Sequence, residues 1–105
     1  MKIPYEFELM GTTITVKFVA ELMHESDALG QACYRTSEIK ILDNSPAYKI
    51  TEEQQMQTFL HELVHWILYQ LKKDDLRKDE DFVDMFAELL MQTLKTMKVD
   101  KRGDK

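Results

Sequence analysis

The chain has 105 residues, 44% of them apolar, and a formal net charge of −5 from 19 acidic and 14 basic side chains. This length suits a single domain, and the acidic balance argues against nucleic acid or a membrane as a partner, because phosphate binding needs a basic surface. No stretch approaches the roughly 18 continuous apolar residues of a membrane span. The single cysteine, Cys33, cannot form an internal disulfide. With no start typical of a signal peptide, this predicts a cytoplasmic protein.

The chain begins with a predicted β-hairpin. Residues 5–9 alternate apolar and polar side chains, and residues 13–18 do so again after Gly11. Two alternating runs around a glycine are typical of two antiparallel strands joined by a turn. Residues 19–29, which follow, fit either a short helix or a loop.

A third extended region is expected to begin at Gly30. Within it, residues 38–42 have the clearest strand pattern, and the turn-forming residues 43–46 end it. We therefore expect residues 1–50 to be mainly β-strand.

The second half of the chain, residues 51–97, is expected to form two long helices. Thr51 and Gln54 match the capping box that starts a helix. Apolar residues then recur at spacings of three and four, so the first helix should run to about Leu71. A charged break at residues 72–75 contains an aspartate suited to cap the second helix. The apolar residues of that second helix are Phe82, Val83, Phe86, Leu89, Leu90, Leu94 and Met97.

These elements predict one α+β domain spanning residues 1–105. In it, a small, mainly antiparallel sheet packs on the helical pair. Residues 98–105 form a polar tail.

The first long helix carries the motif His61-Glu62-Leu-Val-His65. Residues four apart lie on one face of a helix, so the two imidazoles can bind one metal ion. A zinc ion lowers the pKa of its bound water towards about 7, and the neighbouring carboxylate can then accept the proton as the water attacks a carbonyl group. The motif therefore predicts His61 and His65 as zinc ligands and Glu62 as the catalytic base.

A catalytic zinc ion takes three protein ligands and one water molecule. No histidine follows His65 in the chain, so the third ligand is expected to be a carboxylate. Glu80 and Asp84 are one helical turn apart and share a face of the second helix. The acidic candidates in this region are Glu80, Asp84, Asp81 and Glu88.

A carboxylate ligand on the second helix imposes a geometric condition. A helix rises about 1.5 Å per residue, so a first helix that reaches Leu71 leads the chain roughly 9 Å past His65. We therefore expect the second helix to begin near Asp74 or Asp75, or to cross the first steeply, with Glu80 a turn or more inside it.

The order of these residues resembles the gluzincin pattern, in which H-E-x-x-H is followed by N-E-x-x-x-D, here Asp79-Glu80-x-x-x-Asp84. More closely, the chain resembles the short ImmA/IrrE-type metallopeptidase-like proteins of phages and mobile elements. Shared features are a hairpin, L-G-x-x-x-Y at residues 29–34, an I-x-I-like strand, H-E-x-x-H, and E-x-F-V at residues 80–83. The resemblance covers about residues 7–94.

This resemblance implies a zincin-like minimal domain, in the cytoplasm of the host if a phage encodes it. It implies that Glu80 is the third zinc ligand and that Asp84 orients a ligand histidine. Asp79 departs from the asparagine of the larger gluzincins. It also implies a tyrosine or histidine that stabilises the transition state, and spacing selects none of the candidates Tyr34, Tyr48, Tyr69 and His24.

The predicted function is that of a metallopeptidase with one Zn²⁺ per chain. It would hydrolyse peptide bonds of an intracellular protein through a zinc-activated water, with Glu62 as general base. The alternative is a non-catalytic interaction or regulatory module of a phage or mobile element that retains a zinc site. Glu62 favours the enzyme, because a structural zinc site needs no such carboxylate and usually contains cysteines.

The substrate is expected to lie extended along an exposed sheet edge, where it would add a strand. Residues 38–42 are predicted to be that edge, since alternating charges protect edge strands from aggregation. The alternative is an internal strand whose charges face solvent. The candidate substrate-binding residues are Glu38, Ile39, Lys40 and Ile41.

Overall fold

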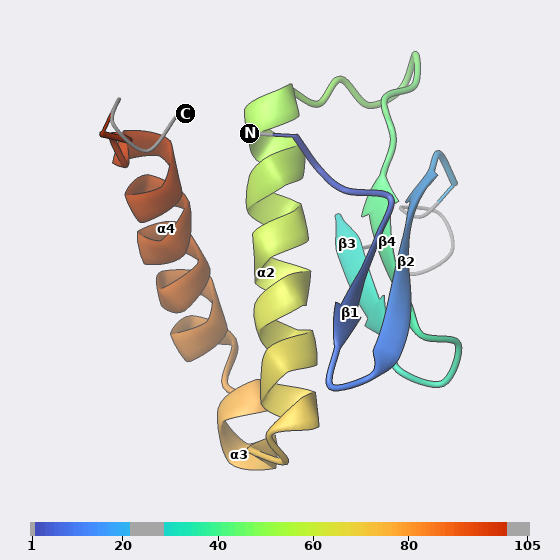
Figure 1. The fold of residues 1–105 in the computed structure, drawn as a ribbon. Coiled ribbons are helices and arrows are strands. Elements are labelled where there is room, and N and C mark those ends of the chain that lie inside the picture. The colour runs from blue at the N-terminus through green and yellow to red at the C-terminus, as the bar shows by residue number, and fades with distance from the viewer. Residues whose placement is uncertain (1, 22–28, 101–105) are drawn as a thin grey trace.

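A computed structural model describes residues 2–21 and 29–100 of the chain. They form an α+β fold with a four-stranded mixed sheet and three helices (Figure 1). The predicted tail begins after the last helix, and its residues 101–105 lie outside the described part. The elements in chain order are β1 (Glu6–Leu9), β2 (Thr12–Val19), β3 (Gly30–Cys33), β4 (Glu38–Leu42), α2 (Glu52–Gln70), α3 (Asp74–Arg77) and α4 (Glu80–Thr96).

The predicted hairpin is confirmed. Strands β1 and β2 pair antiparallel, with Phe7 opposite Ile14. The turn between them uses left-handed backbone at Met10 (φ 48°) and Gly11 (φ 83°). Glycine adopts such a conformation without steric cost, which explains why the turn falls there.

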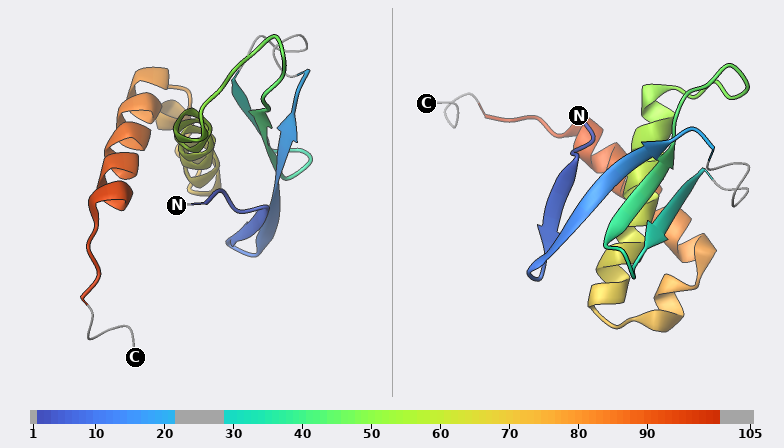
Figure 2. Two further views of the ribbon diagram at one scale, coloured as in Figure 1. Left: turned by 90° about the horizontal axis from the view of Figure 1, so that it is seen from above. Right: turned by 90° about the vertical axis from the view of Figure 1, so that its right-hand side faces the viewer.

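The sheet has the strand order β1-β2-β4-β3 and is mixed: two of its three pairings are antiparallel, in line with the expected mainly antiparallel sheet, and one is parallel. Strand β4 pairs parallel with β2 and antiparallel with β3. It is therefore internal, and the prediction that residues 38–42 form an edge was wrong. The charged residues that suggested an edge also occur on an internal strand: Glu38 forms an ion pair with Lys17 of the neighbouring strand β2. Within the described residues, the edges are β1 and β3 (Figure 2).

Helix α2 lies between the sheet and α4, so the molecule has three layers (Figures 1 and 2). Its capping box is present, with Thr51 as N-cap and reciprocal bonds to Gln54. Because α2 is covered on two sides, it buries apolar side chains around much of its circumference. The core combines sheet and helix residues: Ile14, Val16, Ile39, Ile41, Met56, Phe59, Leu60, Val64, Trp66, Leu68, Val83, Ala87 and Met91.

The segment after α2 differs from the expected pair of long helices. The chain leaves α2 at Lys72, whose φ is 59°, and forms the single-turn helix α3 before α4. Asp79, rather than an aspartate of residues 72–75, caps α4 by accepting a hydrogen bond from the backbone N–H of Phe82. Glu80 is thus the first residue of α4, not a turn or more inside it. Helix α3 returns the chain towards the middle of α2, which a continuous helix would not do.

Among the described residues, no helix combines the length and the apolar character that crossing a membrane requires.

Candidate metal centre

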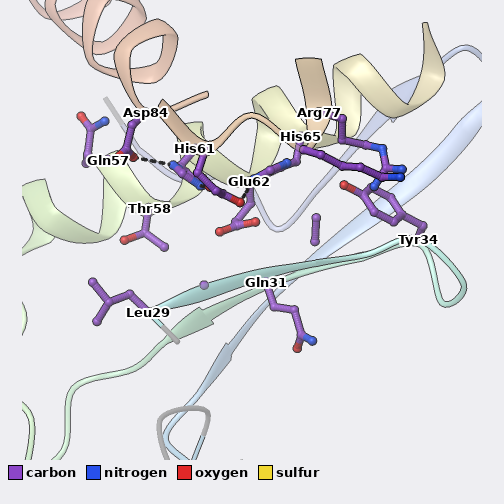
Figure 3. Close-up of a pocket in the computed structure, with 14 residues that line it drawn as sticks. Leu29, Gln31, Tyr34, Gln57, Thr58, His61, Glu62, His65, Arg77 and Asp84 are labelled. Carbon is purple, nitrogen blue, oxygen red and sulfur yellow. Dashed lines mark hydrogen bonds and ion pairs between the residues drawn. The ribbon is translucent and has the colours of Figure 1, made fainter. Parts of the chain in front are cut away.

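Helix α2 presents both histidines of the motif on the side that faces the start of α4 (Figure 3). The ring centroids of His61 and His65 are 5.0 Å apart, and the rings are inclined by 62°. The spacing of four residues brings the rings together, as expected for one face of a helix.

Glu80 completes a group of three ligand atoms. Its Oε2 lies 3.1 Å from Nε2 of His61, and its Oε1 lies 3.3 Å from Nε2 of His65. One atom from each of the three side chains lies within 4.8 Å of the others, so the group could hold a metal ion. Two imidazole nitrogens and one carboxylate oxygen suit a divalent transition metal such as zinc.

Each histidine has a further hydrogen-bond partner besides Glu80. Nδ1 of His61 lies 2.8 Å from Oδ1 of Asp84. Burial lowers the pKa of His65, whereas the nearby Glu80 and a hydrogen bond to the backbone of Arg77 raise it. A partner on one ring nitrogen fixes the tautomer and turns the other nitrogen towards the metal position, as is usual for metal-binding histidines.

Glu62 points into the same pocket but from the buried side, with 7% of its surface exposed. Burial raises the pKa of its carboxyl group to about 7; the nearby Glu80 also raises it, whereas His61 and a hydrogen bond to the backbone of Ala32 lower it. A carboxyl group with this pKa can both accept and release a proton near neutral pH.

Gly30 explains how β3 comes so close to α2. A Cβ atom at this position would lie 2.4 Å from Cγ2 of Thr58 and 3.1 Å from Oε2 of Glu62. Only glycine leaves room for this close contact between β3 and the part of α2 that carries Thr58 and Glu62. Sequence analysis treated Gly30 only as the start of an extended region, although a glycine in a strand often marks such an approach.

The site opens into a pocket of about 700 Å³ between β3, α2 and the segment from α3 to α4. Tyr34, which directly follows β3, lines this pocket at the end away from Leu29 (Figure 3). Its ring stacks on Tyr69 at 4.2 Å between centroids, and the guanidinium of Arg77 lies 5.2 Å from its centroid. Arg77 was missed by sequence analysis, because nothing in its local pattern marks it.

The remaining candidates lie elsewhere. Asp81 and Glu88 are exposed and belong neither to the three-ligand group nor to the pocket lining. The ring of Tyr69 stacks on that of Tyr34 and does not line the pocket. Tyr48 lines a second pocket. His24 lies outside the described residues.

Comparisons of the chain with protein-family patterns, with curated proteins and with solved structures give no match. A function for this chain therefore has to rest on its own residues and their arrangement.

Proposed function

We propose that the chain is a zinc-dependent peptidase of the zincin type, acting on peptide bonds of an intracellular protein, as the resemblance to ImmA/IrrE-type proteins also implies. The observation that carries the proposal is the convergence of His61, His65 and Glu80 beside the buried carboxyl group of Glu62. Metal ligands alone would suit a structural metal site, whereas catalysis also needs a base beside the metal-bound water, here Glu62.

Zinc is the metal that best fits this set of residues. Two histidines and one carboxylate can also bind iron, but a glutamate placed directly after the first ligand histidine suits hydrolysis. A zinc ion in this position would polarise the substrate carbonyl and acidify a bound water. The carboxylate of Glu62 would take up the proton of that water and later deliver it to the leaving amine.

Tyr34 is the candidate that we propose for stabilising the negative charge that develops on the carbonyl oxygen. It is the one tyrosine of the three described candidates that lines the site pocket. Burial raises the pKa of its hydroxyl group, so the group stays protonated at neutral pH and can donate a hydrogen bond. Arg77 hydrogen-bonds the Tyr34 side chain and would hold it in place.

The substrate would lie along β3 instead of the strand expected from the sequence. The N–H of Leu42 donates to the carbonyl of Leu29 at 2.8 Å. The alternation of an antiparallel ladder then turns the backbone groups of Gly30 and Ala32 away from β4, towards the open side of the sheet. An extended peptide could pair with the N–H and carbonyl of Gly30 and with the carbonyl of Ala32, since the N–H of Ala32 already donates to Glu62. Such pairing would bring a substrate carbonyl over the metal position.

The non-catalytic module remains the second candidate. A non-catalytic module would use the three metal ligands. It would not need Glu62, whose carboxyl group is buried in the pocket with its pKa raised to about 7. Burying such a group costs stability, so its presence favours catalysis.

The test is proteomic cleavage profiling with zinc-loaded protein. Wild type should generate new peptide termini, and Glu62→Gln should generate none while it keeps zinc and fold, because only the base is removed. Equal cleavage by both proteins would exclude Glu62 as the base. No cleavage by wild type, in a mixture that a known zinc endopeptidase cleaves, would favour the non-catalytic module.

A further inference from the structure

Two positively charged side chains line the metal pocket. They belong to Arg77 and Lys78, the only arginine and lysine of its lining within the described part of the chain. Arg77 lies beside Tyr34 at one end of the pocket, whereas Asp84 lies beside Gln57 at the other end (Figure 3). The charge of the lining therefore changes along the pocket, and we call the end at Arg77 the basic end.

The guanidinium of Arg77 is held in place but keeps donors for a ligand. Its Cζ lies 5.2 Å from the ring centroid of Tyr34 and 5.8 Å from that of Tyr69. Nε and Nη2 each lie 3.3 Å from Oδ1 of Asp74, whose side chain is 62% exposed. Such an exposed ion pair is weak. A guanidinium has five N–H donors, so donors remain after those that Asp74 and Tyr34 use.

Lys78 adds a second positive charge directly after Arg77. It is the C-cap of α3, and its side chain is exposed. No carboxylate of residues 2–21 or 29–100 forms an ion pair with it. A fixed guanidinium next to an unpaired ammonium group favours a carboxylate ligand, because hydrogen bonds between charged groups are about twice as strong as those between neutral groups.

The direction of β3 determines which part of the substrate meets the basic end. A peptide that exchanges two hydrogen bonds with Gly30 pairs antiparallel with β3. The strand begins at Gly30, and Tyr34 directly follows its last residue, so the N-terminal part of the peptide passes Tyr34. Ala32, whose backbone hydrogen-bonds Glu62, precedes Tyr34 by about 7 Å of extended chain. The basic end therefore meets the substrate residues that come shortly before the cleaved bond.

We propose that Arg77 and Lys78 form a specificity subsite for an acidic side chain, that of glutamate or aspartate, in one of the three substrate residues that precede the cleaved bond. The inference rests on the proposed peptidase function and adds a substrate class to it. A carboxylate fits because it can accept two parallel hydrogen bonds from a guanidinium, and the neighbouring ammonium group attracts it. A lysine or arginine of the substrate would meet two like charges there and would be rejected.

The sequences of the cleavage sites test this subsite. A peptide mixture derived from a whole proteome is incubated with the zinc-loaded wild-type chain, and the new termini are read by mass spectrometry. Glutamate and aspartate should be enriched within the three positions before the cleaved bond, and lysine and arginine depleted. Cleavage without this enrichment, or with enrichment only after the cleaved bond, overturns the subsite and leaves the peptidase function standing. Complete absence of cleavage contradicts the function and the subsite together.

Two synthetic peptides that differ in one residue measure the preference directly. A cleaved sequence is prepared with glutamate or with glutamine at the enriched position, and kcat/KM is determined for both peptides. Wild type should prefer the glutamate peptide at least about tenfold, since a hydrogen bond to a charged group is worth about that factor. The preference should fall as the salt concentration rises, because exposed charges are screened. Equal kcat/KM for the two peptides overturns the proposal.

A charge reversal at Lys78 has a matched control in the same segment. Lys78→Glu should lower the ratio of kcat/KM for the glutamate peptide to that for the glutamine peptide at least about tenfold. Lys73→Glu changes the net charge equally, and Lys73 is also exposed but lies outside the metal pocket. It should leave the ratio within about twofold of wild type. Equal changes from the two substitutions would show that net charge alone matters, and would overturn the subsite.

Arg77 needs a test that separates the subsite from its contact with Tyr34. Arg77→Gln should slow the cleavage of both peptides, because the hydroxyl group of Tyr34 loses its partner. That loss affects the two peptides alike and cancels in the ratio of their kcat/KM values, whereas loss of the subsite affects the glutamate peptide alone. The double variant Arg77→Gln/Lys78→Gln should therefore show a ratio near one. A ratio equal to that of wild type overturns the proposal.

Discussion

Glu62 has a carboxyl group that the fold keeps away from water, and this makes the metal-free protein sensitive to pH. Its pKa in the folded chain is about 7, against an ordinary value of 4.5. Because the folded pKa is the higher one, the stabilising effect of the protonated form is complete below about pH 4.5 and is lost as the pH rises through about 7. The difference corresponds to at most about 3 kcal/mol.

Thermal unfolding in the presence of a chelator measures this effect. Between pH 5 and pH 8, wild type should lose more stability than Glu62→Gln, in which the buried group cannot ionise. Curves that run parallel for the two proteins would show that the Glu62 carboxyl group titrates at an ordinary pKa.

We expect Asp84 to contribute to zinc binding by orienting His61, because it does not belong to the three-ligand group. Its Oδ1 lies 2.8 Å from Nδ1 of the histidine, and its side chain is 74% exposed. We predict that Asp84→Asn weakens zinc binding about 10–100-fold, the usual effect of removing such an orienting partner. Competition titration with a chromophoric chelator measures the affinity. Asp81→Asn, three residues earlier on α4 and outside the site, is the control; a loss of equal size there would mean that Asp84 acts only through net charge.

Residue types and spacing were enough to predict His61, Glu62 and His65 as members of one site, because a four-residue spacing on a helix determines their proximity. Glu80 and Asp84 needed the resemblance to be chosen among neighbouring acids. Gly30 and Arg77 could not be assigned, since their roles depend on contacts between segments far apart in the sequence.

At the scale of elements, β3 packs on α2 through a glycine. Gly30→Ala would place its Cβ 2.4 Å from Cγ2 of Thr58, a side chain whose hydroxyl donates to the carbonyl of Gln54 at 3.0 Å and so holds its rotamer. We predict a loss of stability of about 1–3 kcal/mol, as for other overpacked positions. Denaturant unfolding measures it.

A second substitution separates steric conflict from other effects of alanine. Thr58→Ser removes Cγ2, so the double variant Gly30→Ala/Thr58→Ser should recover part of the lost stability. If the double variant is no more stable than Gly30→Ala, the contact with Thr58 is not the cause.

The elements themselves could be predicted where the pattern is local. The hairpin, the strand of residues 38–42 and the capped start of α2 follow from alternation, turn residues and the capping box. The break of the second helical region could not be predicted, because α3 is a single turn. Its backbone turn at Lys72 uses a positive φ that no glycine marks. The expected position of Glu80 was wrong for that reason.

At the scale of the whole molecule, the candidate metal centre joins two layers. His61 and His65 belong to α2, and Glu80 begins α4, so a bound ion would link the middle helix to the outer one. We predict that zinc raises the melting temperature, because an ion that binds only the folded chain stabilises it by about 4 kcal/mol at a concentration 1,000 times the Kd. Calorimetry with zinc and with excess chelator measures the shift. Identical melting temperatures would show that no ion links the layers.

The sheet order is the feature of the whole molecule that sequence reasoning did not reach. Alternation predicts strands but not which strands are neighbours, and the parallel pairing of β2 with β4 joins segments separated by about twenty residues. The charges of Glu38 and Lys40 fit an edge or a solvent-facing surface equally well. In the structure this strand is internal. The proposed substrate path therefore lies along β3.

The central claim is that His61, His65 and Glu80 bind one zinc ion per chain. Metal analysis of the purified protein by inductively coupled plasma mass spectrometry tests it most directly, and it also identifies the metal. We predict one zinc per chain in wild type and in Glu62→Gln, less in Glu80→Gln, and none in His61→Ala/His65→Ala. Full metal content in that double variant would contradict the account.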